Sequence, residues 1–170
     1  AKLLNEKKYD EVVQDLDVDT IEEAKAYLEK FGVDENRVEI WGTGKPMREF
    51  LWSEDMADAC VFILENRDFK DTFKMIKSSN ETCSVKSVYS TEIKNTHINI
   101  GTGTDISIKD LSEMIKEIVG FKGELYFNTD KPDGTMKKLT DVSKLHGLGW
   151  KHTVELEEGI KKMYQWYKDK

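Results

Sequence analysis

The hydrophobic and polar positions of the chain change their period several times along its length. Residues 1–36 carry many charges, and apolar residues recur at helical spacing from Thr20 until Gly32, which favours a helix closed by a glycine. We therefore expect a charged helical segment here. Because the chain begins at Ala1 without a methionine and inside a helix predicted over Ala1–Lys8, we expect its N-terminus to be cut.

A strand–turn–strand–helix pattern follows over residues 37–65. Arg37–Gly42 alternates like a strand and leads into a glycine- and proline-containing turn, after which Arg48–Trp52 is predicted to form a short second strand. Ser53 is suited to cap the helix that follows. The apolar residues predicted to share one face of that helix are Met56, Cys60, Ile63 and Leu64.

The rest of the chain is first polar and then mixed. Residues 66–96 lack a sustained period, and we expect a variable surface excursion. Residues 97–170 predict strands at His97–Gly101 and Glu124–Asn128. The predicted helices are one that begins at a Ser107–Asp110 capping box and ends at Gly120, a short one capped by Asp141 that stops near Gly147, and an amphipathic final one through Leu156, Ile160, Met163 and Tyr167. Short strands alternating irregularly with helices predict a small mixed α/β layer, not a complete doubly wound sheet.

Composition limits the classes of partner. With 26 basic and 33 acidic side chains, the 170-residue chain has a net charge of -7, which argues against nucleic acid and, more weakly, against an anionic membrane surface. A locally basic pocket for a phosphorylated ligand is still compatible with this charge. The two cysteines, Cys60 and Cys83, form no metal pattern, and we interpret Cys60 as a small core residue in a reduced, cytoplasmic protein.

The segment Trp41–Phe50 carries the first candidate chemistry. Its two glycines and proline bend the backbone sharply, so that Trp41 can stack on a base or cover a ribose while Arg48 pairs with a phosphate. The alternative is an ordinary hairpin, in which Trp41 packs in the core and Arg48 pairs with Glu49 or Asp55. Both interpretations remain open on spacing alone.

Two further segments contain glycine turns. The Pro-Asp-Gly turn within Lys131–Lys138 can place Asp133 on ribose hydroxyls and Lys138 beside a diphosphate, and its alternative is a solvated turn. Asn99–Thr104 lacks the third glycine of a dinucleotide-binding loop, and we interpret it as a simple turn.

The sequence contains no strand–Gly-x-x-Gly-x-x-Gly–helix unit. A tyrosine is followed four residues later by a lysine at Tyr164, within the charged final helix, and we attribute this pair to chance. The three histidines stand without a matching nucleophile or metal spacing. No catalytic residue, cofactor-binding residue or metal ligand is therefore assigned.

In order and spacing, six segments resemble the GDP-L-fucose synthase family of extended short-chain dehydrogenases/reductases. They are Val38–Ala57, His97–Gly103, Lys131–Thr135, Lys138–Asp141, Leu148–Trp150 and Tyr164–Trp166. The resemblance implies that residues 1–170 form the C-terminal substrate-binding domain, with a small mixed sheet and helices, lacking most of the Rossmann domain. It also implies that Trp41, Arg48, Asp133 and Lys138 contact a GDP-sugar.

The family epimerises a GDP-4-keto-6-deoxy-hexose at C3 and C5 and reduces C4 with NADPH, so the resemblance implies an NADP-dependent oxidoreductase and isomerase of nucleotide-sugar biosynthesis. It further implies that NADP binds to an N-terminal domain absent from this chain, that the isolated chain is inactive, and that the full-length protein is a homodimer. The helix over Glu54–Glu65 would face the absent domain and expose apolar surface. Departures at Lys45, Trp52, Ser53 and Met136 leave a GDP-deoxy-heptose reductase open, and a stand-alone, non-catalytic nucleotide-sugar-binding or interaction module is a further alternative.

Overall fold

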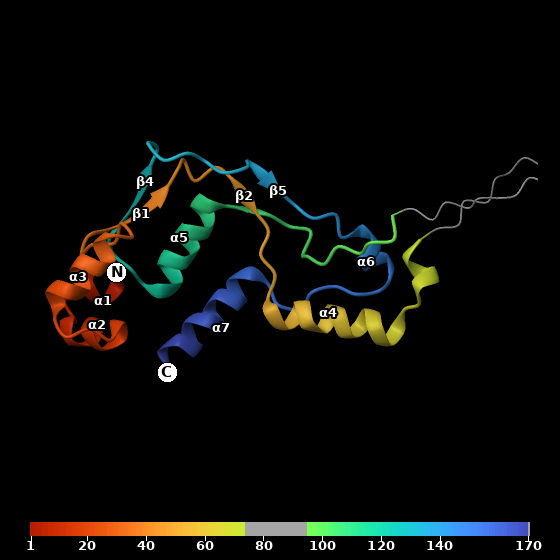
Figure 1. The fold of residues 1–170 in the computed structure, drawn as a ribbon, viewed down its shortest axis with the longest axis horizontal. Helices are drawn as coiled ribbons and strands as arrows, with labels where there is room; N and C mark the ends of the chain where they lie inside the picture. Colours follow the sequence, from red (N-terminus) through yellow and green to blue (C-terminus); the bar gives the residue numbers. More distant parts are fainter. Residues whose placement is uncertain (74–94, 170) are drawn as a thin grey trace, which may run out of the picture. The chain divides into compact units, whose positions relative to one another are not determined.

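The computed structural model describes residues 1–73 and 95–169, which Figure 1 draws in colour. These residues form two compact units. Unit 1 consists of Ala1–Phe50, Thr104–Leu139 and Glu155–Lys170, and unit 2 of Leu51–Gly103 and Thr140–Val154.

Unit 1 begins with three short helices, α1 (Lys2–Asn5), α2 (Tyr9–Leu16) and α3 (Ile21–Glu29). Thr20 caps α3, because its side chain accepts a hydrogen bond from the Glu23 N–H at 3.2 Å. The three helices share a small hydrophobic core of buried Leu4, Val12 and Ala24. The helical pattern of residues 1–36 therefore predicted helices correctly, and Gly32 adopts the left-handed conformation after α3.

Two small sheets follow in unit 1. Strand β1 (Arg37–Trp41) pairs in parallel with β4 (Glu124–Asn128). Strand β2 (Met47–Arg48) lies between β3 (Ile106–Ser107), which is antiparallel to it, and β5 (Lys137–Lys138), which is parallel. The hairpin alternative is therefore wrong, because β1 and β2 belong to different sheets and each pairs with strands distant in sequence.

Two longer helices complete unit 1. Ser107 caps α5 (Ile108–Val119) and accepts a hydrogen bond from the Asp110 N–H at 3.0 Å, while Gly120 ends the helix with φ 78°. The predicted serine cap and glycine terminus are therefore present, with the Asp110 carboxylate accepting a hydrogen bond from the Ser107 hydroxyl at 2.6 Å and not from its N–H. Helix α7 (Leu156–Lys168) contacts α5.

Unit 2 is organised around α4 (Ser53–Asn66), η1 (Phe69–Thr72) and α6 (Ser143–Gly147). Its core contains Ala59, Leu145 and Trp150, against which Leu51, Phe62, Ile63, Ile98 and Ile100 pack. The short helix after Asp141 ends at Gly147 as predicted, but its N-cap is Val142 and not Asp141. The Asp141 carboxylate accepts a hydrogen bond from the Ser143 N–H at 3.0 Å.

Several local predictions within residues 37–65 and 97–170 are wrong. The strand over Arg48–Trp52 is limited to β2, and no strand forms at His97–Gly101, because Ile98 and Ile100 pack on the core in irregular backbone. Ser53 is the first residue of α4 and not its cap. Cys60 is exposed and not a core residue, because α4 buries the neighbouring Ala59 instead.

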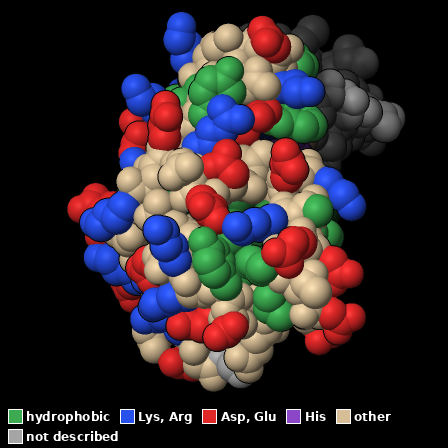
Figure 2. Space-filling view, turned by 90° about the vertical axis from the view of Figure 1, so that its left-hand side faces the viewer, with side chains coloured by type: hydrophobic (Ala, Val, Ile, Leu, Met, Phe, Trp, Pro, Cys, Tyr) green, Lys and Arg blue, Asp and Glu red, His purple; other side chains and the backbone are tan. Residues whose placement is uncertain are grey.

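Residues 74–94, which make up most of the predicted surface excursion, lie outside the described residues. None of the helices in the described part of the chain is long and apolar enough to cross a membrane. On the face drawn in Figure 2, basic and acidic side chains are interspersed, and neither sign gathers in one large area.

Candidate functional site

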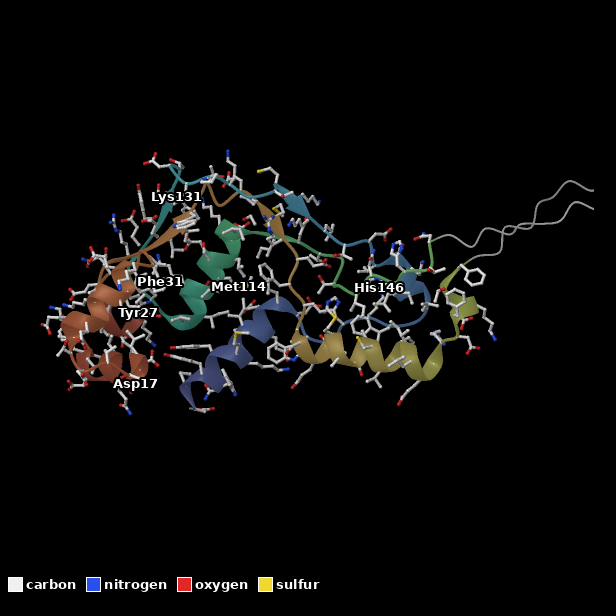
Figure 3. All side chains as sticks on the ribbon, in the orientation of Figure 1. Asp17, Tyr27, Phe31, Met114, Lys131 and His146 are labelled. Carbon is white, nitrogen blue, oxygen red and sulfur yellow. The ribbon has the colours of Figure 1, made fainter. Side chains whose placement is uncertain are left out.

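Trp41 lies at the end of β1 and exposes 68% of its surface. It is therefore not a core residue, which contradicts the alternative drawn from spacing. The Lys131 ammonium lies 5.2 Å from the centre of the Trp41 indole ring, within the range of a cation–π interaction. Figure 3 labels Lys131 near the end of the β1–β4 sheet. An exposed indole beside a cation can stack against a planar or sugar ring of a negatively charged ligand.

The turn after Trp41 depends on its glycines. Gly42 has φ +82°, and a Cβ atom at this position would lie 2.2 Å from Oδ1 of Asp133. Gly44 has φ +74°, and a Cβ atom there would meet the Phe127 ring at 2.6 Å. Glycine is thus required both for the backbone conformation and for the close approach of residues from β4 and the segment after it.

Asp133 is bound to this turn. Its Oδ1 accepts a hydrogen bond from the Thr43 N–H at 2.8 Å, and its Oδ2 accepts one from the Thr43 hydroxyl at 2.6 Å. The hydrogen bonds from the Thr43 hydroxyl and N–H hold the pKa of the Asp133 carboxyl below its ordinary value. The carboxylate is therefore charged at neutral pH, and its remaining lone pairs are available to a further donor.

Arg48 is held by backbone carbonyls. Its Nη1 donates to Met47 O at 2.6 Å and to Thr135 O at 2.7 Å. Asp55, one of the two acidic partners considered for Arg48, instead accepts hydrogen bonds from the 153–154 segment. Backbone anchoring fixes the plane of the guanidinium without neutralising its charge, which suits it to an anion.

Lys138 lies opposite Arg48 in the parallel pairing of β2 with β5, and both residues of β5 are exposed. Its neighbour Lys137 forms an ion pair with Asp105 at 3.3 Å. Despite the net charge of -7, this part of unit 1 therefore presents two cationic side chains on adjacent strands. Such a pair can bind a diphosphate by charge-assisted hydrogen bonds.

All four residues predicted from the sequence thus lie in unit 1, carried by β1, β2, β5 and the Pro-Asp-Gly turn. Trp41 and Arg48 lie in one stretch of sequence, and Asp133 and Lys138 lie in another. The pairing of β1 with β4 and of β2 with β5 brings these two stretches side by side. Sequence reasoning did not assign Thr43 or Lys131. A threonine between two glycines, two residues after Trp41, was the available signal for the first.

The glycine loop at Gly101–Gly103 does not fit a dinucleotide. Residues 95–100, which the structure describes directly before it, form no strand, and a Cβ atom on Gly103 would lie 2.8 Å from Cγ2 of Val142, so packing already explains this glycine. Tyr164 accepts a hydrogen bond from Lys2 and donates one to Val119 O, which gives it a structural role. Among the described residues, no cluster of His, Cys, Asp and Glu is arranged to hold a metal ion.

The chain is similar to known proteins. Residues 3–77 match the NAD dependent epimerase/dehydratase family. The GDP-L-fucose synthase of Escherichia coli (strain K12) is 41% identical over 130 residues, which is 76% of this chain and 36% of that protein.

Two solved structures from Campylobacter jejuni are more similar still. A GDP-6-OMe-4-keto-L-xylo-heptose reductase is 52% identical with a TM-score of 0.85, covering 99% of this chain and 44% of that one. A GDP-D-glycero-L-gluco-heptose synthase, solved in the presence of NADPH, is 51% identical with a TM-score of 0.82, covering 98% of this chain and 43% of that one. The chain spans about a third of the length of the curated relatives it matches.

Proposed function

We propose that this chain is the GDP-sugar-binding portion of an NADP-dependent epimerase/reductase. The proposal is supported by its similarity to GDP-L-fucose synthases and by its match to the C-terminal part of an extended short-chain dehydrogenase/reductase. The observation that carries this proposal is that Arg48 lies opposite Lys138 in the paired strands β2 and β5, while Asp133 accepts two hydrogen bonds from Thr43, two residues after Trp41. In the whole protein, the reaction would act on the 4-keto group of a GDP-linked sugar.

Each side chain has a role that its chemistry supports. Arg48 and Lys138 would neutralise the diphosphate; because Nη1 of Arg48 is bound to Met47 O and Thr135 O, its phosphate contact would fall to Nη2 and Nε. Trp41 would stack on a ring of the ligand. Asp133 would offer its remaining lone pairs to a ribose hydroxyl.

NADP would supply the hydride for reduction at C4. The glycine loop at Gly101–Gly103 does not fit a dinucleotide, so we assign NADP binding to other residues of the whole protein. The acid, base and proton-donor groups of the reaction are likewise assigned elsewhere, and the described residues of this chain serve to bind and orient the sugar nucleotide.

A GDP-linked heptose is the second candidate for the substrate, with C4 reduction and without obligatory epimerisation. The heptose enzymes are more than 50% identical over nearly the whole chain, whereas the Escherichia coli GDP-L-fucose synthase is 41% identical over 76% of it. The two candidates share the nucleotide, so the site described above suits both. They differ in the sugar and are distinguished by assaying the full-length enzyme with each 4-keto substrate.

Calorimetric titration of the chain with GDP tests the proposed site. We expect binding by the wild type and its loss in Arg48→Ala. The matched control is Arg37→Ala, because Arg37 lies at the other end of the β1 segment and pairs with Asp34 at 3.1 Å. Equal affinity in all three proteins would contradict the assignment of Arg48 to the diphosphate. Binding of GDP by the chain combined with an inactive full-length enzyme would favour a non-catalytic binding module.

A further inference from the structure

Thr43 makes more contacts than a solvent-facing turn residue needs. Its N–H and hydroxyl both donate to the Asp133 carboxylate, at 2.8 and 2.6 Å. The same hydroxyl oxygen accepts a hydrogen bond from the Lys45 N–H at 3.2 Å. One side chain therefore closes its own turn and binds a segment 90 residues away in the sequence.

The two segments joined by this contact carry the candidate ligand-binding groups. On one side of it, the Lys131 ammonium lies over the Trp41 ring at 5.2 Å. On the other side, Arg48 donates to Thr135 O at 2.7 Å. A shift of Asp133 relative to Thr43 would therefore change the placement of both the indole and the guanidinium relative to the basic segment.

We propose that Thr43 is a positioning residue of the nucleotide site, which acts through Asp133 to fix the Lys131–Lys138 segment against the turn that links Trp41 to Arg48. The inference rests on the proposed function, because it requires that Trp41 and Arg48 bind the ligand. It adds a residue whose own side chain need not touch the nucleotide. The glycine at position 42 is part of this arrangement, since any side chain there would occupy the space of the Asp133 carboxylate.

The contact is suited to this role by its geometry and charge. Two parallel hydrogen bonds to one carboxylate restrict both distance and orientation, as a single bond does not. Holding the segment in advance lowers the conformational entropy that ligand binding would otherwise lose. Removing the hydroxyl leaves the N–H bond alone and frees the segment to rotate about it.

Two substitutions separate the hydroxyl from the shape of the side chain. Thr43→Val keeps the branched shape and removes the hydroxyl, whereas Thr43→Ser keeps the hydroxyl and removes the methyl group. We expect GDP affinity, measured by calorimetry on the full chain, to fall about tenfold in Thr43→Val and to return to within about twofold of wild type in Thr43→Ser. Unchanged affinity in Thr43→Val, or failure of Thr43→Ser to restore it, overturns the inference.

Hydrogen exchange of the backbone amides over residues 42–46 provides a readout that needs no ligand. The Thr43 N–H donates to Asp133 and the Lys45 N–H donates to the Thr43 hydroxyl. We therefore expect exchange to become at least about tenfold faster at Thr43 in Asp133→Ala and at Lys45 in Thr43→Val. If the wild type fails to bind GDP, the proposed function fails at this site. The exchange result then decides the Thr43–Asp133 contact by itself, because equal exchange in wild type and variants overturns it.

Discussion

Asp55 accepts two hydrogen bonds from Thr153, one from its backbone N–H at 3.2 Å and one from its hydroxyl at 2.7 Å. A third, from the Val154 N–H at 2.9 Å, completes the arrangement. Asp55 lies in the first turn of α4 and is 4% exposed. Within unit 2, it therefore ties the start of this helix to a segment almost a hundred residues later.

Replacing Asp55 should destabilise the chain more than replacing any exposed acid on the same helix. We expect Asp55→Ala to lower the free energy of unfolding by about 1–3 kcal/mol, because it leaves the part-buried N–H groups of Thr153 and Val154 and the Thr153 hydroxyl without their acceptor. Glu65→Ala, at an exposed position of α4, is the control and should change it by less than about 0.5 kcal/mol. Urea unfolding of the three proteins measures both values, and equal losses would contradict the structural role of Asp55.

The same carboxylate should make stability depend on pH. Burial disfavours the charged form of Asp55, but hydrogen bonds from Thr153 and Val154 outweigh this and hold its pKa below the ordinary 3.8. Since the folded pKa is depressed, the unfolded chain binds more protons in acid, and the stabilisation present above the unfolded pKa is lost as pH falls through the folded pKa. The stability difference between wild type and Asp55→Asn should therefore be constant from pH 7 to about 5 and shrink below pH 4. A difference that grows in acid would show the opposite shift.

Gly42 should be intolerant of a side chain. In Gly42→Ala the new Cβ would lie 2.2 Å from Oδ1 of Asp133, at a backbone φ of +82°, so we expect about 1–3 kcal/mol of destabilisation and weaker GDP binding. Gly147→Ala is the matched control, because a Cβ there meets no atom within 4 Å and the residue lies in helix α6. Thermal unfolding and GDP titration measure both effects, and similar behaviour of the two variants would contradict the close approach of Asp133.

Trp41 should report nucleotide binding through its fluorescence. We expect GDP to quench the emission of the wild type and to have little effect on Trp41→Phe, since stacking places the base or sugar against this indole. Trp166→Phe is the control, because Trp166 is similarly exposed, at 61% against 68% for Trp41, and lies in α7. Equal quenching of Trp41→Phe and wild type would move the ligand away from Trp41.

The exposed apolar residues of α4 should promote association. Met56, Val61 and Leu64 are 42%, 49% and 83% exposed, which is unusual for large hydrophobic side chains on one helix. We expect sedimentation of the chain to depend on concentration, and Leu64→Lys to shift it toward the monomer. A lysine at the neighbouring exposed position, in Glu65→Lys, should have the smaller effect. A wild-type chain that stays monomeric at every concentration would contradict this prediction.

Local signals in the sequence predicted the helices better than the sheets. The Ser107–Asp110 box and Gly120 gave both ends of α5, because caps are interactions between residues close in the chain. Strand pairing depends on residues far apart, so the hairpin interpretation of the segment after Trp41 was wrong although its first strand was placed correctly. The strand predicted at His97–Gly101 failed for the same reason, since alternation reflects burial of Ile98 and Ile100 and does not require a partner strand.

The candidate site, too, was predicted in its residue types but not in its long-range contacts. The residue types at Trp41, Arg48, Asp133 and Lys138 suggested their chemistry, and their roles in binding stay predictions until the titrations are made. Residue types cannot indicate which of these side chains are already hydrogen-bonded to other parts of the protein. The bonds of Asp133 to Thr43 and of Arg48 to Thr135 O connect segments whose proximity follows from tertiary pairing alone.

The parallel pairing of β1 with β4 also has a consequence for the order of folding. Thr43 and Asp133 are 90 residues apart, so their contact carries a loop-closure entropy that the local contacts within a helix do not. Contacts of such long range form slowly, and α3 and α5 can be complete before the two strands meet. During synthesis, the surface that bears Trp41 cannot be completed until the ribosome has passed Asp133, so α1, α2, α3 and α5 of unit 1 are all made before this surface can form.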